Sequence, residues 1–336
     1  MENQVRTTTL KVVEGAKSVK INHEKIRGLA NEWNEQKITI PSWPKEMHLE
    51  TKDEKKMIDY LVVLDTLNFC FWIRGGRWSI NYNGEQHNGY FALSLALKEY
   101  FEKYQERLDW DYFSRISFRE FSEILQGGAN LMFLKKRWQI LRAVAAVLIK
   151  KYGGGADEFI ASANGSAAKL VEKTHKELPS FDDAAAYGGR KIYFLKRAQI
   201  LAVDIHAALN PVRNRARPGR AISNGVNGSG LGRLDDLDYF TAFADYKLPQ
   251  ILRHYRVLEY SPRLRDKIDK QILIPAGSRE EVEIRAAIVW VVEYLKDELE
   301  KLGRKFYAFE IDWILWNKSR EEKIDKPYHL TKTIFY

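Results

Sequence analysis

Apolar residues recur at intervals of three and four along most of this chain, which is the spacing of amphipathic helices. The pattern predicts helices over residues 92–108, 135–152 and 196–209. Three consecutive glycines, 153–155, follow the second of these helices. A phosphate-binding glycine loop joins a strand to a helix start, so glycines that come after a helix favour a C-terminal cap instead.

A fourth long helix is predicted to extend from Ser278 to about residue 302, because Ser278 and Glu281 have the spacing of a capping box. Alternation of apolar and polar residues is limited to 78–82, which runs into Asn83-Gly84, a dipeptide typical of tight hairpin turns. The sequence therefore predicts a mainly α fold with at most a short β-hairpin near residues 77–90.

The length fits one large domain or two closely packed ones, and we expect a single domain over residues 1–336 with an insertion at 211–234. The insertion contains four arginines and then a run rich in Gly, Asn and Ser, a composition typical of flexible segments. We expect a flexible basic insertion there. Two interpretations stay open, a solvated loop and a lid or arm that attracts phosphate.

The chain has 54 Lys and Arg against 45 Asp and Glu, a formal charge of +9, which favours a partner that carries phosphate. It contains a single cysteine, Cys70, so no disulfide can form within the chain. The sequence has neither an apolar signal core at its N-terminus nor a run long enough to cross a membrane. These features predict a cytoplasmic protein.

Carboxylates and aromatic rings are the best candidates for chemistry, because HExxH, GxSxG and Walker motifs are absent and the seven histidines are scattered. Asp65, Asp245 and Asp312 each stand in an apolar stretch, where a charge is costly unless it is needed. Each could instead be a helix cap or a satisfied core group. Asp312 fits that alternative least well, because Trp313 and Trp316 follow it.

Five segments in consistent order resemble the queuosine salvage protein family, and the likeness covers roughly residues 17–336. The segments are Leu64-Asp65-Thr66-Leu67-Asn68-Phe69-Cys70-Phe71-Trp72, Phe194-Leu195-Lys196-Arg197-Ala198-Gln199-Ile200-Leu201, Phe243-Ala244-Asp245-Tyr246-Lys247-Leu248-Pro249-Gln250, Glu281-Val282-Glu283-Ile284-Arg285 and Pro327-Tyr328-His329-Leu330-Thr331-Lys332.

The resemblance implies an N-glycosidase that hydrolyses queuosine 5′-monophosphate and releases queuine, the base that is salvaged into tRNA. It also implies a compact helical fold similar to helix-hairpin-helix DNA glycosylases, with no metal and no cofactor. Direct tRNA binding is not expected. The insertion at 211–234 departs from the compact family pattern.

The family resemblance assigns the catalytic role to Asp312, which would stabilise an oxocarbenium-like transition state or act as a nucleophile. Asp245 would accept hydrogen bonds from the guanine-like edge of the base, between the rings of Phe243 and Tyr246. The other residues expected around the base are His48, Asn68, Trp313 and Asn317. Position 317 is Asn where the family leads us to expect Asp, so a charge-pairing role there is in doubt, and a surface position is the other interpretation of His48.

Lys196 is the first candidate for the 5′-phosphate, and Lys332 and His329 are the second. Two other functions stay open. The charge, the arginines and the aromatic residues also fit a nucleic-acid glycosylase or a non-catalytic tRNA-binding protein. A helical scaffold would use the carboxylates only as caps.

Overall fold

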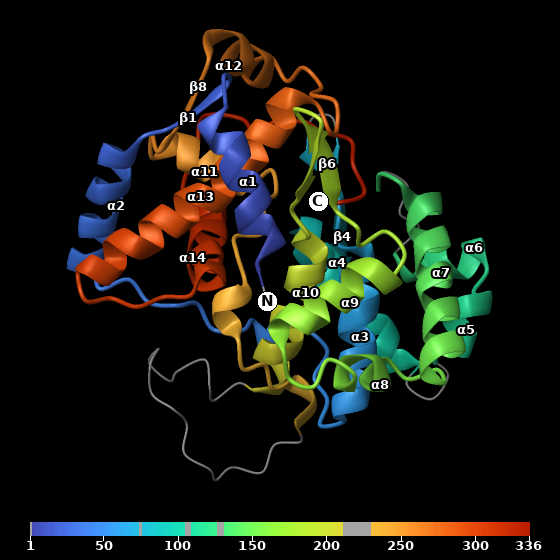
Figure 1. The fold of residues 1–336 in the computed structure, drawn as a ribbon. Coiled ribbons are helices and arrows are strands. Elements are labelled where there is room, and N and C mark those ends of the chain that lie inside the picture. Colours follow the sequence, from blue (N-terminus) through green and yellow to red (C-terminus); the bar gives the residue numbers. More distant parts are fainter. Residues whose placement is uncertain (1, 74–75, 105–108, 126–130, 211–229) are drawn as a thin grey trace.

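The computed structural model describes residues 2–73, 76–104, 109–125, 131–210 and 230–336. Helices dominate the described residues (Figure 1). The α-helices are α1 (Gln4–Glu14), α2 (His23–Glu35), α3 (Glu54–Leu67), α4 (Gly89–Lys103), α5 (Trp110–Arg115), α6 (Phe118–Ile124), α7 (Leu134–Tyr152), α8 (Ala156–Ala161), α9 (Ala167–Glu177), α10 (Lys196–Leu209), α11 (Leu248–His254), α12 (Pro262–Asp269), α13 (Arg279–Lys301) and α14 (Ala308–Glu321).

The long helices predicted from the sequence are confirmed. Helices α7 and α10 match their predicted ranges, and Gly153 caps α7 in the left-handed conformation at φ 61°. Helix α4 begins at Gly89, three residues before the predicted start, and ends at Lys103. Ser278 caps α13 through its side chain, but the Glu281 carboxylate accepts from Gly277 N and Tyr336 Oη, so only the serine half of the predicted capping box forms.

The predicted hairpin is also confirmed, since β4 (Ser79–Tyr82) and β5 (Glu85–Asn88) pair across Asn83-Gly84. The limit of a single hairpin was wrong, because the described residues contain three more two-stranded antiparallel sheets. They are formed by β1 (Val19–Ile21) with β8 (Leu258–Tyr260), β2 (Trp72–Ile73) with β3 (Gly76–Arg77), and β6 (Ala184–Tyr187) with β7 (Arg190–Tyr193). These strands are two to four residues long, too short to produce a period-two pattern.

Figure 1 shows α5, α6 and α7 together at one side of the molecule and α2, α13 and α14 at the other. Helices α3, α4, α9 and α10 lie between these groups, and α3 packs against both α7 and α10. Most of α3 is buried, from Met57 to its last residue, so this helix is apolar on nearly every side and forms the centre of the core.

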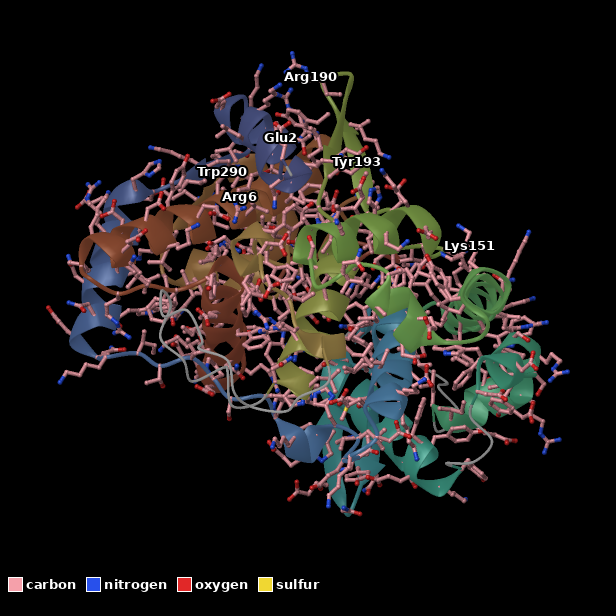
Figure 2. The ribbon with its side chains drawn as sticks, turned by 60° about the horizontal axis from the view of Figure 1, so that its bottom comes forward. Glu2, Arg6, Lys151, Arg190, Tyr193 and Trp290 are labelled. Atoms are coloured by element: carbon pink, nitrogen blue, oxygen red, sulfur yellow. The ribbon has the colours of Figure 1, made fainter. Side chains whose placement is uncertain are left out.

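Elements from the two ends of the sequence pack against each other. Helix α1 lies along α13, where Trp290 Nε1 donates to Thr9 Oγ1 at 3.0 Å and Arg6 Nε donates to Glu293 Oε1 at 2.8 Å. Arg6 and Trp290 lie close together in Figure 2. The antiparallel pairing of β1 with β8 adds a second long-range link.

Residues 211–229 of the predicted insertion lie outside the described residues. Its last part, 230–234, packs against the rest of the fold, because Gly232 and Leu234 are buried. Asn210 Nδ2 donates to Gly232 O at 2.8 Å, and a Cβ at position 232 would lie only 2.5 Å from Leu209 Cβ. Helix α10 therefore accepts only glycine at this contact.

None of the helices in the described part of the chain combines the length and apolar composition needed to cross a lipid bilayer.

Candidate active site

A cavity lies where α3, α4, α10 and α14 come together. Its wall combines aromatic rings with carboxylate, amide and ammonium groups. The lining residues fall in the segments 41–48, 68–71, 90–91, 196–204, 243–247 and 312–320, with Tyr336. Because these segments are far apart in the sequence, the cavity depends on the whole helical assembly.

Helix α14 brings Asp312 to the cavity together with Trp316 one turn later. Asp312 is 3% exposed, and its Oδ2 accepts a hydrogen bond from Phe243 N at 2.7 Å. Burial raises the pKa of Asp312 well above its ordinary value, and the nearby charge of Asp245 raises it further. A cationic group of a ligand that approached this carboxyl would favour its ionised form.

Asp245 has two roles in its local structure. Its Oδ1 accepts hydrogen bonds from Lys247 N at 2.8 Å and Leu248 N at 2.9 Å, so it caps the first turn of α11, as the sequence indicated. Among the described residues nothing donates to its Oδ2, and Asp245 lines the cavity. A cap thus fixes the side chain while one oxygen stays available to a ligand.

The C-terminal end of α3 carries Asn68, which lines the cavity, and Asp65, which is not among the lining residues. Asn68 Nδ2 donates to Asp65 Oδ1 at 3.2 Å, while Asp65 Oδ2 is buried without a hydrogen-bond partner in the described part of the chain. Burial raises the pKa of Asp65 to about 7, although Asn68, Lys196 and Arg197 oppose the shift. This carboxyl is therefore close to titration at neutral pH.

Two buried arginines hold the backbone after α3 in place. Arg197 Nη1 donates to Asp65 O at 3.1 Å and to Thr66 O at 2.8 Å. Arg137 donates to the carbonyls of Leu67, Phe69 and Cys70. The free carbonyls at a helix C-terminus attract cations, so both arginines suit this position. They position residues 68–71, three of which line the cavity.

Lys196 begins α10, and its backbone N donates to Asp183 Oδ2 at 3.1 Å. Its side chain lines the cavity, where burial lowers the pKa of Lys196 and the carboxylates of Asp245, Asp65 and Asp312 partly restore it. An ammonium with these neighbours acts as their counter-charge. The predicted phosphate role of Lys196 gains no support from such acidic surroundings.

His48 is fully buried, so the surface position that the sequence left open was wrong. Tyr60 Oη donates its proton to Ser94 O, and therefore accepts from His48 Nδ1, 3.2 Å away. Tyr90 Oη lies 3.5 Å from His48 Nε2 and donates to Asp204 Oδ2 at 3.2 Å. Burial lowers the pKa of His48 to about 3, so the ring is neutral, with Nε2 as an acceptor.

The cavity brings together most of the residues predicted from the sequence. Asp312 and Lys196 line it, and so do all seven residues expected around the base: His48, Asn68, Phe243, Asp245, Tyr246, Trp313 and Asn317. Asn317 Nδ2 donates to Trp313 O at 2.9 Å, which leaves its carbonyl for a ligand.

His329 and Lys332 are not among the lining residues. His329 is buried, with Nε2 3.3 Å from Tyr336 Oη, and burial lowers its pKa to about 3, so it carries no charge for a phosphate. Lys332 is exposed. Their predicted phosphate roles also lack support from the cavity.

The polar lining residues that sequence reasoning missed include Tyr90, Asp204, Lys247 and Arg320. Asp204 interrupts the apolar run of α10, the same signal that singled out Asp65, so it could have been found. Arg320 follows Asp312 by eight residues, or about two helical turns, but its charge resembles that of any surface arginine.

The fold and the cavity define a helical protein with a buried carboxylate site that suits a polar ring compound. The sequence model of the queuosine salvage protein family matches residues 47–216 and 221–336, and the chain belongs to this family.

Three relatives named queuosine 5′-phosphate N-glycosylase/hydrolase align over nearly their whole length. That of Sphaerobacter thermophilus is 39% identical over 333 residues, which cover 99% of this chain and 97% of the relative. That of Dictyostelium discoideum is 34% identical over 346 residues, 99% and 98% of the two chains. That of Mus musculus is 28% identical over 347 residues, 97% and 96% of the two chains.

Proposed function

We propose that this chain is an N-glycosidase that hydrolyses queuosine 5′-phosphate. One water is consumed, the bond between the base and ribose C1′ is broken, and the products are queuine and ribose 5-phosphate. The observation that carries the proposal is the buried carboxyl of Asp312 in a cavity walled by aromatic rings. The similarity to relatives of that name over nearly the full chain supports it.

Asp312 is the proposed catalytic residue. Cleavage of a ribose–base bond builds positive charge at C1′, as in an oxocarbenium ion, and a carboxylate that lies against it lowers the barrier. Asp312 would stabilise this charge or attack C1′ as a nucleophile. Burial raises the pKa of Asp312, whereas the positive charge that develops at C1′ favours the ionised form that catalysis needs.

The base would lie between the aromatic residues and the polar groups of the wall. Asp245 Oδ2 is available to accept N–H groups from the guanine-like edge, and Phe243 and Tyr246 offer rings for stacking. Queuine also carries a cationic amine. Asp204, whose pKa burial raises well above its ordinary value, would pair with that amine, because a cation restores the ionised carboxylate.

The test is incubation with four compounds, queuosine 5′-phosphate, queuosine, guanosine 5′-phosphate and tRNA that contains queuosine, with detection of released base by mass spectrometry. We expect queuine from queuosine 5′-phosphate and no base from guanosine 5′-phosphate or from tRNA. Release from tRNA would favour the nucleic-acid glycosylase instead, and no release from any substrate would contradict the proposal.

Three broader expectations accompany this function. We propose that the helices share the arrangement of helix-hairpin-helix DNA glycosylases, that residues 1–336 form a single domain, and that the protein acts in the cytoplasm. The pairing of β1 with β8 and of α1 with α13 supports the single domain. The single cysteine is compatible with a reducing compartment.

A further inference from the structure

Three cations gather at the cavity. Lys247 and Arg320 line it, and Arg77 lies near the ring of Tyr328, as does Lys247. The Arg77 Cζ lies 5.7 Å and the Lys247 Nζ 6.0 Å from the centre of this ring. Lys247 Nζ also donates to Ser319 O at 3.1 Å, next to Arg320 in the sequence. We call Arg77, Lys247 and Arg320 the basic cluster.

The basic cluster has neutral hydrogen-bond partners. Lys247 donates to Gln250 Oε1 at 2.7 Å as well as to Ser319 O, and Arg77 donates to Asn88 Oδ1 at 3.3 Å. The Arg320 guanidinium lies over the rings of Phe91 and Trp316. Among the residues that the structure describes, no carboxylate forms an ion pair with any of these three cationic groups.

Like charges held close together repel one another. Burial and then the charges of Arg77 and Arg320 lower the pKa of Lys247 to about 8, although Asp245 opposes the shift. Partial burial and Arg77 also lower the pKa of Arg320, although Glu321 opposes the shift. A bound anion with several acceptor oxygens would relieve the repulsion, and a phosphate dianion can be shared among three such donors.

We propose that the basic cluster is the subsite for the 5′-phosphate of the nucleotide, so that Lys247, Arg320 and Arg77 determine the preference for nucleotide over nucleoside. This inference rests on the proposed function, and it replaces the phosphate role predicted for Lys196. The cavity then has an acidic part at Asp204, for the cationic amine of the base, and a basic part for the phosphate. A ligand that is cationic at one end and anionic at the other is held in one orientation.

The decisive variant is Arg320→Gln, because Arg320 is exposed and its loss should not unfold the chain. We expect kcat/KM for queuosine 5′-phosphate to fall about ten- to a hundredfold, the usual effect of losing one hydrogen bond to a charged group. For queuosine it should change less than about threefold. Lys247→Gln should lower kcat/KM for queuosine 5′-phosphate in the same selective way. The control is Arg190→Gln, which removes a charge from the exposed tip of the β6–β7 hairpin and should leave kcat/KM for both substrates unchanged (Figure 2).

The proposed phosphate subsite would be contradicted if Arg320→Gln lowered kcat/KM equally for queuosine 5′-phosphate and queuosine, or lowered it for neither. Calorimetric titration with ribose 5-phosphate and with ribose tests it without any chemistry, so a failure of the proposed glycosidase reaction would be recognised separately. Wild type should bind ribose 5-phosphate more tightly than ribose, and Arg320→Gln should abolish the difference. Equal binding of both sugars by wild type would contradict the proposal, as would inhibition by unmodified tRNA that depends on Arg320, since this would assign the cluster to a nucleic-acid backbone.

Discussion

Two sets of buried charged groups lie at or near α10, and they differ in how fully their partners compensate the charge. In the first set, Arg285 donates through both Nη atoms to the carboxylate of Asp183, at 2.8 and 2.7 Å. Asp183 also accepts from Lys196 N. In the second set, the carboxyls of Asp65, Asp204 and Asp312 each accept a hydrogen bond from a neutral donor, an amide, a phenol or a backbone N–H.

The direction of the pKa shifts shows what this difference means. Although burial opposes it, Asp183 raises the pKa of Arg285, so that pair is a stable ion pair. Burial raises the pKa of Asp65, Asp204 and Asp312 instead, as expected for carboxyls whose negative charge is poorly compensated. Buried pairs with good geometry hold a fold in place, whereas buried groups with raised pKa values gather where a ligand completes them.

The largest expected effect is that of Asp312→Asn on catalysis. Asparagine keeps the shape but cannot carry the negative charge that opposes the charge at C1′, so kcat should fall by about a thousandfold or more. The free energy of unfolding should not fall, because the lost carboxyl was costly to bury. Single-turnover release of queuine and urea denaturation measure the two quantities.

Glu310→Gln is the matched control for Asp312→Asn. Glu310 lies on the same helix, and burial raises its pKa to about 7, but it accepts from Tyr307 N and does not line the cavity. Its replacement should leave kcat unchanged. Near-normal turnover of Asp312→Asn, or an equal loss in Glu310→Gln, would remove the catalytic role from Asp312.

The next largest effect is on stability, and we expect it from a change in the ion pair of Asp183 and Arg285. Asp183→Asn leaves Arg285 buried beside a neutral amide, so the free energy of unfolding should drop by about 3 kcal/mol. Asp182→Asn, at the exposed neighbouring position, should change it by less than about 0.5 kcal/mol. Urea denaturation of both variants checks this, and equal stability of the two would mean that the ion pair has no structural role.

Helical periodicity carried most of the fold prediction. The limits of α7 and α10 could be read from the sequence, because each helix has an apolar face of several turns that is buried. The strands β6 and β7 could not, since four residues around Gly188-Gly189 give too little pattern. The pairing of β1 with β8 joins residues more than two hundred positions apart, which no local signal indicates.

Some residues of the candidate site could likewise be predicted from the sequence, and others could not. Asp312 and Asp245 could be singled out because a carboxylate in an apolar stretch is unusual and because the family resemblance implies a role for each. The basic cluster could not be found, because Arg77, Lys247 and Arg320 come from three distant segments and each looks like an ordinary surface charge. Only the fold brings them together.

The smallest expected effect would show that a carboxyl of the second set lowers the stability of the fold, in contrast to the ion pair of Asp183 and Arg285. In Asp65→Asn the new amide oxygen can still accept from Asn68 Nδ2, while the buried charge is lost.

Burial raises the pKa of Asp65 to about 7 in the folded chain, so between about pH 4 and 7 the native chain keeps a proton that the unfolded chain releases. Wild-type stability therefore falls as the pH rises through this range. The variant should therefore be more stable than wild type at pH 8, and the gain should shrink toward zero near pH 4. Urea denaturation across this range measures the difference, and a gain that is absent or independent of pH would mean that Asp65 is as well compensated as Asp183.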